Sequence, residues 1–337
     1  MKICFLHLGL HKTASSSFQQ TCAANRLILD QAGLFYPIFR CDQARPPRLK
    51  INNHSVPLRC LYDKNPQNYH INKRWKVGDI NAAIQDYTLQ FEQALQSDQS
   101  IVLSGEGLSL LTADALARLA GVIENHGFQI KPMILVRSPL DYAHSIAQQL
   151  VRGGQYVSLV GLGPLRSPCL PQRLTIPDGL KEIRTLQKVF DQRLVAVPFR
   201  HACRHRCGPV GYLLETFRGL STVDSIDFKQ TQESKSNLWV RLQNQVNERW
   251  PRFDQKKRLN DAHFRIQEDY SRSGSFRLTQ HEVDLLSDQL LHSNQGLSDL
   301  LGSEFIEASD EVSSDISDRM LLDLFMEQLV VAQSRRA

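Results

Sequence analysis

Residues 3–20 read ICFLHLGLHKTASSSFQQ, and this stretch decides the fold. The apolar run 3–8 has the length of a strand, and Gly9 interrupts it. Residues 13–29 then carry apolar side chains at helical spacing. The stretch therefore predicts a strand, a tight turn that carries a lysine, and a helix that opens with hydroxyl side chains.

The predicted turn and helix start carry the groups that bind a phosphate-like anion. The first backbone N–H groups of a helix have no internal partner, and the helix dipole favours negative charge there. Hydroxyls at positions 13 and 15–17 add donors, and Lys12 adds a point charge. A Walker A loop needs Gly-x-x-x-x-Gly-Lys-Ser/Thr, whereas His11 precedes the lysine here, so the pattern does not favour a nucleotide triphosphatase.

Residues 7–19 resemble the 5′-phosphosulfate loop of the PAPS-dependent sulfotransferases. The bacterial carbohydrate-type members of that family write it as His-x-Gly-x-His-Lys-Thr-Gly-Thr-Thr-x-x-Gln. Ala14 stands here in place of the family glycine, and Ser15-Ser16 stand in place of the Thr-Thr pair. The resemblance assigns the cofactor-binding role to seven consecutive residues, namely His11, Lys12, Thr13, Ala14, Ser15, Ser16 and Ser17.

A second part of the resemblance follows the predicted strand 131–136. Ser138 is a good N-cap and Pro139 a good first helical residue, so Arg137 should end the strand and Ser145 should lie two turns into a helix. The family's 3′-phosphate site reads Arg-x-Pro-x-Asp-x-x-x-Ser, and residues 137–145 match every anchor position. Arg137 offers a rigid fork of donors to a phosphate, and Ser145 adds a hydroxyl.

Two residues are candidates for the base that deprotonates an acceptor. His54 lies in Asn52-Asn53-His54-Ser55, which resembles an Asn-His-Ser segment of the bacterial members, although it could be only a polar loop residue. Glu106 follows the predicted strand 100–104 and should stand at its carboxyl end, where open α/β sheets bind ligands. Glu106 could also begin a helix, pair with a cation, or orient the base.

The chain offers little sign of a metal site or a disulfide framework. On a strand, His201, Cys203, His205 and Cys207 would share one face, but their spacing matches no common zinc pattern and arginines crowd them. The seven cysteines are odd in number and scattered, so we expect a reducing cytoplasm. We see no signal peptide, and no run approaches the roughly 18 apolar residues of a membrane span.

The 337 residues carry a net charge of +5, which suits an enzyme that handles anions better than a dedicated nucleic-acid binder. We expect a sulfotransferase core over residues 1–225, with loop insertions at about 33–78 and 153–179. We expect a mostly helical extension over 226–337. Between residues 40 and 76, cations outnumber acids, which predicts either a solvated surface or a rim that attracts an anionic cofactor or acceptor.

The resemblance implies an α/β fold, with a central parallel sheet flanked by helices and a P-loop-like arrangement. It also implies in-line transfer of the sulfuryl group from PAPS to an acceptor hydroxyl, without a metal, on a carbohydrate or related metabolite. Positioning and charge stabilisation would carry the rate, with Lys12 beside the departing 5′-phosphate. Two alternatives stay open: a P-loop-type nucleotide kinase, and a non-catalytic relative that binds a nucleotide or a glycan.

Overall fold

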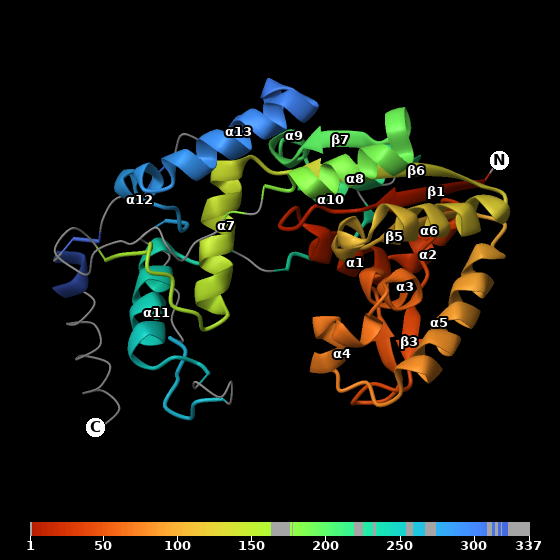
Figure 1. The fold of residues 1–337 in the computed structure, drawn as a ribbon, viewed down its shortest axis with the longest axis horizontal. Coiled ribbons are helices and arrows are strands. Elements are labelled where there is room, and N and C mark those ends of the chain that lie inside the picture. The colour runs from red at the N-terminus through yellow and green to blue at the C-terminus, as the bar shows by residue number, and fades with distance from the viewer. Residues whose placement is uncertain are drawn as a thin grey trace. The chain divides into compact units, whose positions relative to one another are not determined.

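The computed structural model describes residues 2–162, 176, 178–218, 225–231, 234–253, 259–266, 274–308, 312–313, 316–317 and 319–322 (Figure 1). The chain forms two compact units. The first comprises Met1–Ser138, Asp178–Gln232 and Gln295–Glu307. The second comprises Pro139–Pro177, Glu233–Asn294 and Ala308–Ala337. One division, at residue 232, lies near the expected boundary at 225, but residues 139–177 group with C-terminal residues rather than with the expected core.

A five-stranded parallel sheet forms the centre of the first unit (Figure 1). Its strands are β1 (Lys2–His7), β2 (Leu34–Phe35), β5 (Ser100–Ser104), β6 (Phe128–Val136) and β7 (Val195–Pro198). They lie in the order β2-β5-β1-β6-β7, so β1 is central. His7, the last residue of β1, lies opposite Ser104 of β5 and Met133 of β6. This arrangement confirms the predicted α/β class and the parallel sheet.

Successive residues of the central strands pack into different apolar clusters. Cys4 and Leu6 of β1 belong to one cluster, whereas Phe5 between them belongs to another. Ile101 and Val102 of β5 divide between the same two clusters. Because successive side chains of a strand point to opposite faces, the sheet is covered on both sides, as parallel sheets generally are.

Helices of the first unit cover these two faces. They are α1 (Ser15–Ala24), α2 (Arg26–Gln31), α5 (Ile80–Leu95), α6 (Ala113–Asn125), α8 (Leu180–Phe190), α9 (Phe199–Cys203) and α10 (Gly208–Arg218). The side chain of Asp79 caps α5 by accepting from the amides of Asn81 and Ala82, and Thr112 caps α6 in the same way. The short 3₁₀ segments are η2 (Glu106–Leu110), η4 (Asp191–Arg193) and η7 (Ser303–Phe305).

Residues 33–78, which we expected to be an irregular insertion, are largely regular structure. They hold β2, the antiparallel pair β3 (Phe39–Cys41) and β4 (Leu49–Ile51), α3 (Ser55–Tyr62), η1 (Pro66–Asn68) and α4 (His70–Arg74). Pro57 and Pro66 lie in the first turns of α3 and η1, where a proline interrupts no hydrogen bond. These two prolines therefore begin elements, whereas Pro37, Pro46 and Pro47 lie between elements, so the segment is only partly irregular.

The second unit is built on helices. They are α7 (Pro139–Arg152), α11 (Asn237–Arg249), α12 (Gln280–Asp284) and part of α13 (Ser287–Leu301). α7 begins at Pro139, as the sequence predicts, and its Ala143, Ala147 and Val151 pack in one apolar cluster with Trp239 and Val240 of α11. Because the three α7 positions recur at helical spacing, one face of α7 packs into the core of this unit.

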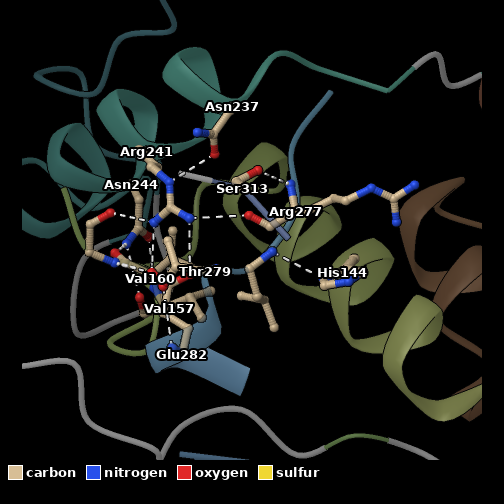
Figure 2. A network of polar contacts seen from close by, with 12 residues as sticks. His144, Val157, Val160, Asn237, Arg241, Asn244, Arg277, Thr279, Glu282 and Ser313 are labelled. Carbon is tan, nitrogen blue, oxygen red and sulfur yellow. Dashed lines mark hydrogen bonds and ion pairs between the residues drawn. The ribbon is translucent and has the colours of Figure 1, made fainter. Parts of the chain in front are cut away.

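A buried ion pair joins the polar groups of the second unit (Figure 2). Arg241 is 1% exposed and its guanidinium donates to both carboxylate oxygens of Glu282, at 2.6 and 3.0 Å. Arg241 also donates to Asn237 Oδ1 and to the carbonyls of Gly161 and Arg277. The backbone N–H groups of Gly161 and Thr279 donate to Glu282. Both charges are thus surrounded by hydrogen-bond partners, as buried charges require.

Part of the sequence-based prediction lies outside the described residues. This holds for about half of the expected insertion 153–179 and for residues 323–337 of the expected helical extension. Within the described part of the chain, no helix is long and apolar enough to cross a membrane.

Candidate active site

The loop between β1 and α1, residues 8–14, follows the end of the central strand. We call it the anion loop. The amides of Leu8 and Leu10 donate to the carbonyls of Met133 and Leu135 on β6, and the amide of Leu135 donates to Gly9. A Cβ at Gly9, whose φ is +95°, would lie 3.0 Å from the Cα of Glu106. Only a glycine fits this approach without strain, so the loop is fixed against both neighbouring strands.

The second half of the anion loop turns sharply into α1. Lys12 and Ala14 both have positive φ, at 65° and 63°. This left-handed conformation favours glycine, so the alanine at position 14 is strained. The Thr13 hydroxyl is buried and donates to the carbonyl of Leu10 at 2.6 Å. Thr13 therefore stabilises the turn, and its hydroxyl proton already has an acceptor.

The N-terminus of α1 has unsatisfied donors. Its N-cap is Ala14, which supplies no side-chain acceptor to the amides of the first turn. Ser15 is 5% exposed, and among the described residues its hydroxyl has no hydrogen-bond partner. An unsatisfied buried hydroxyl costs free energy, and an anion at this helix end would provide its acceptor. The groups present here fit the phosphate that the sequence predicts.

The other two serines of the motif differ from Ser15. Ser16 is half-buried, whereas Ser17 exchanges hydrogen bonds with Thr231, whose amide donates to the Ser17 hydroxyl at 3.1 Å. Three side chains spaced four residues apart hold the backbone of residues 227–231 against α1 in this way: Ser17, Thr21 and Asn25. Ser17 thus has a structural partner, which the sequence pattern did not indicate.

Arg137 lies at the carboxyl end of β6 and reaches the anion loop. Its guanidinium donates to the carbonyl of Lys12 at 3.1 Å and lies over the ring of Phe199 at 4.9 Å. The two motifs, 125 residues apart in the chain, therefore meet at adjacent strand ends. Ser145 is half-buried on α7, in the second unit, and its predicted partnership with Arg137 stays a prediction.

Glu106 lies at the carboxyl end of β5, beside the anion loop. Its Oε2 accepts from Nε2 of Gln19 at 3.1 Å, and its Oε1 accepts from Nδ2 of Asn53 at 3.4 Å. Gln19 comes from α1 and also donates to the carbonyl of Ser104. Two amide side chains therefore orient a half-buried carboxylate next to Gly9. Only the carboxylate was predicted from the sequence, because nothing local to Gln19 or Asn53 indicates this contact.

The geometry does not favour His54 as a base. Its side chain is fully buried, its Nδ1 accepts from the amide of Ser104 at 2.8 Å, and its Nε2 lies 2.8 Å from the carbonyl of Pro37. Both ring nitrogens thus have backbone partners, so the ring must carry its proton on Nε2. Burial lowers the pKa of His54 to about 4, and the ring is neutral. His54 fastens β5 to the chain before β3.

His7 is a second buried histidine at this strand end. Its Nδ1 lies 2.9 Å from the Ser104 hydroxyl, and its ring packs edge-on against Phe18. Burial lowers the pKa of His7 to about 4, so this ring is neutral as well. Neither histidine adds positive charge near the anion loop.

His70, on α4, lies within electrostatic reach of Arg59 and Glu106. Burial lowers the pKa of His70, and the positive charges of Arg59, His11 and Arg74 lower it further, whereas Glu106 raises it. His11, from the predicted motif, is exposed, as is His70. The sequence did not single out His70 or Arg59. Only the excess of cations between residues 40 and 76 pointed to this region.

Arg59 has a fixed orientation. It is held by Asp63 at 2.5 Å and lies over the ring of Tyr69 at 4.6 Å. A Cβ at Gly107, the residue after Glu106, would lie 3.4 Å from its Cδ. The arginine therefore packs directly beside the segment that carries the carboxylate.

The structure gives no support to a metal site. Among the described residues, no group of three His, Cys, Asp or Glu side chains could hold a metal ion. His201 and Cys203 lie on helix α9 rather than on a strand, and His205 binds Glu215 at 2.6 Å. The strand geometry considered for these residues was therefore wrong.

Comparison of the chain with family models, curated proteins and solved structures finds no match. The family resemblance consequently depends on the two motifs, and the site must be judged by its geometry.

Proposed function

We propose that this protein transfers a sulfuryl group from PAPS to a hydroxyl group of an acceptor. One observation carries the proposal: three chain segments meet at the carboxyl ends of β1, β5 and β6. They are the anion loop with Lys12, the Arg137 guanidinium bonded to that loop, and Glu106, whose Cα and Cβ pack against Gly9. This edge of a parallel sheet is where α/β proteins bind ligands.

On the donor side, the first turn of α1 holds the 5′-phosphate. The backbone N–H groups there point toward the helix end, and the Ser15 hydroxyl lacks an acceptor among the described residues. Lys12 adds the positive charge. The resemblance assigns the 3′-phosphate to Arg137 and Ser145.

When bound, PAPS supplies the sulfuryl group, and its adenosine bisphosphate part is the leaving group. The Lys12 ammonium stabilises the negative charge that grows on the departing phosphate. Glu106 accepts the proton of the acceptor hydroxyl, because its carboxylate is oriented by Gln19 and Asn53 and lies beside the anion loop. His54 does not take this role in the proposal, because both of its nitrogens are occupied.

The acceptor is a hydroxyl compound, a carbohydrate or a related metabolite, and the reaction takes place in the cytoplasm. The acceptor approaches Glu106 from the side of α3 and α4, where Arg59 and the exposed His70 lie. These residues can donate hydrogen bonds to an acceptor's oxygens. Positioning by such contacts is the main contribution that a protein can make to a group transfer of this kind.

Ligand-induced thermal stabilisation tests the donor site. Adenosine 3′,5′-bisphosphate, the desulfated product, is compared with AMP and with ATP plus Mg²⁺. A ligand at a hundred times its dissociation constant adds about 2.7 kcal/mol to the free energy of unfolding. We expect the bisphosphate to stabilise the protein and ATP not to do so. Ser15→Ala should weaken bisphosphate binding about tenfold or more, because a hydrogen bond to a charged group contributes roughly 1.5–3 kcal/mol.

Thr185→Ala is the matched control for Ser15→Ala. It removes a hydroxyl on α8 that donates to the carbonyl of Lys181 in the same helix, so bisphosphate binding should not change. Preferential stabilisation by ATP with Mg²⁺ would instead favour a nucleotide kinase. If neither nucleotide stabilises the protein, the donor site is refuted.

Turnover is tested with PAPS and a panel of hydroxyl acceptors. Glu106→Gln keeps the shape of the side chain and removes the base, so it should abolish turnover while bisphosphate binding persists. Bisphosphate binding without turnover on any acceptor would favour the non-catalytic relative. Undiminished turnover in Glu106→Gln would show that Glu106 is not the base.

A further inference from the structure

Exposed apolar side chains gather in the second unit, directly after α11. Trp250, Phe253, Leu259 and Phe264 are 39, 45, 68 and 50% exposed. They lie on two segments, residues 250–253 and 259–264, which we call the aromatic arms (Figure 1). Scattered exposed apolar residues need no explanation, but four large ones within fifteen positions indicate an interaction surface.

The aromatic arms run antiparallel and are held together by their backbones. Phe253 and Leu259 form an antiparallel bridge, and the amide of Asn260 donates to the carbonyl of Arg252 at 2.9 Å. The rings of Trp250 and Phe264, one from each arm, lie 5.6 Å apart. The apolar side chains therefore form two pairs across the arms, since residues directly opposite in an antiparallel bridge share a face.

Buried side chains of α11 fasten the second arm to the unit. The amide oxygen of Gln243 accepts from the N–H of Ile266 at 2.9 Å, and its Nε2 donates to the carbonyl of Phe264 at 3.2 Å. The indole of Trp239 donates to the carbonyl of Ile266 at 3.0 Å. Because Gln243 is 1% exposed, this attachment belongs to the core of the unit. The exposure of Phe264 is thus imposed by a fixed backbone.

Cationic residues outnumber acidic ones in the sequence of this region. Between residues 249 and 265 the sequence has six Lys or Arg residues and two Asp residues. Arg249 and Arg265 are exposed, and Arg252 lies over the ring of Phe253 at 5.3 Å. Arg252 and Arg265 also donate to the carbonyls of Gly153 and Arg152 at the end of α7, which fixes their direction. Apolar groups rimmed by arginines suit a partner that is both anionic and apolar.

We propose that the aromatic arms bind the surface of an anionic lipid membrane. Exposed Trp, Phe and Leu side chains enter the boundary between headgroups and acyl chains, while arginines bind the headgroup phosphates. A glycan fits this surface less well, because sugars stack on flat aromatic faces. Here the Trp250 and Phe264 rings are tilted by 49°, and the most exposed residue is the aliphatic Leu259. This proposal does not depend on the sulfotransferase activity.

Vesicle sedimentation with the full-length protein tests the proposal. The probes are vesicles of phosphatidylcholine alone and of phosphatidylcholine mixed with phosphatidylglycerol. We expect binding to the mixed vesicles only, and weaker binding at high salt. The double variant Phe253→Ser/Leu259→Ser should lower the partition coefficient about tenfold or more. Leu291→Ser, at an exposed residue on α13, is the matched control and should bind like the unmodified protein.

Several outcomes would overturn the proposal. One is a failure of the unmodified protein to sediment with the mixed vesicles. Another is undiminished sedimentation of the Phe253→Ser/Leu259→Ser variant, provided that its circular dichroism shows it to be folded. Binding to a soluble acidic polysaccharide in place of the vesicles would also overturn it, because the surface would then recognise a glycan.

Discussion

Replacing Glu282 by leucine should unfold the second unit selectively, because the change leaves a buried guanidinium without its counter-ion. Arg241 and Glu282 are 1 and 2% exposed, and two charge-assisted hydrogen bonds join them (Figure 2). Arginine cannot lose its proton in a protein, so Arg241 must stay charged in the variant. Its remaining acceptors, an amide and two carbonyls, carry no charge.

The magnitude follows from these contacts. Removing one partner of a buried ion pair costs about 3–5 kcal/mol. The Glu282 carboxylate also accepts from the amides of Gly161 and Thr279, and each buried donor left unpaired costs about 1–3 kcal/mol. Because these terms overlap, we expect a loss of about 5 kcal/mol, which is comparable to the whole stability of many domains. Arg241→Met should cost less, because the carboxylate keeps both amide donors and can bind a proton.

Urea unfolding followed by tryptophan fluorescence measures these costs. The chain has three tryptophans, and Trp75 belongs to the first unit, so a Trp75→Phe background leaves only Trp239 and Trp250 in the second unit as reporters. Free energies come from the transition midpoints and slopes. Arg249→Met, at an exposed position on α11, is the control and should change the stability by about 0.5 kcal/mol or less.

The double variant Arg241→Met/Glu282→Leu decides whether the reasoning is right. Replacing a whole buried ion pair by apolar side chains is often neutral or stabilising, so the double variant should be more stable than Glu282→Leu alone. A loss below about 1 kcal/mol for Glu282→Leu would contradict the argument. So would a double variant whose loss equals the sum of the two single losses, because no coupling would then exist.

Three further predictions concern stability. Burial lowers the pKa of His7 and His54 from 6.5 to about 4, so between these pH values the unfolded chain binds more protons than the folded one. The free energy of unfolding should therefore fall as the pH drops from 6.5 to 4, by up to about 3 kcal/mol per histidine. A free energy of unfolding that does not change with pH in urea titrations would contradict this. Ala14→Gly relieves a left-handed conformation costing roughly 1–2 kcal/mol, against roughly 0.5–1 kcal/mol of added chain entropy, so thermal melting should show a small gain and not a loss. Thr279→Ala removes the capping box that it forms with Glu282, so the free energy of unfolding in urea should drop by about 1 kcal/mol, and no drop would mean that the cap is dispensable.

Local signals in the sequence predicted much of the first unit. Residues 100–104 form the predicted strand with the predicted bounds, and α7 begins at Pro139 after Ser138. These features depend on apolar runs, on caps and on proline, all of which act within a few residues. In a parallel sheet the carboxyl ends of neighbouring strands lie at the same edge. The sequence therefore also indicated that Lys12, Glu106 and Arg137 lie near one another.

The features that the sequence did not indicate are interactions between distant segments. His54 looked available because its neighbours are polar, but Pro37 and Ser104 take up its two nitrogens, and only the folded chain brings them there. Ser17 looked like a phosphate donor, yet it bonds Thr231, which is 214 residues away. The grouping of residues 139–177 with the C-terminal part likewise depends on contacts between segments that are distant in the sequence. A short motif identifies chemical groups, but it does not say which of them the fold already uses.

The backbone fixes the anion loop and Glu106 relative to each other. Donor binding and acceptor binding in the proposed site should therefore respond differently to substitution. Main-chain hydrogen bonds tie Leu8 and Leu10 to β6, and Gly9 packs against Glu106, so the sheet sets the distance between donor site and base. Positioning of that kind is what a group transfer requires. His70, by contrast, is exposed on a helix of five residues and lies within electrostatic reach of His11 and Glu106. In the proposed enzyme, substitution of His70 should therefore alter the KM for the acceptor and leave donor binding unchanged, whereas changes at Gly9 should impair both.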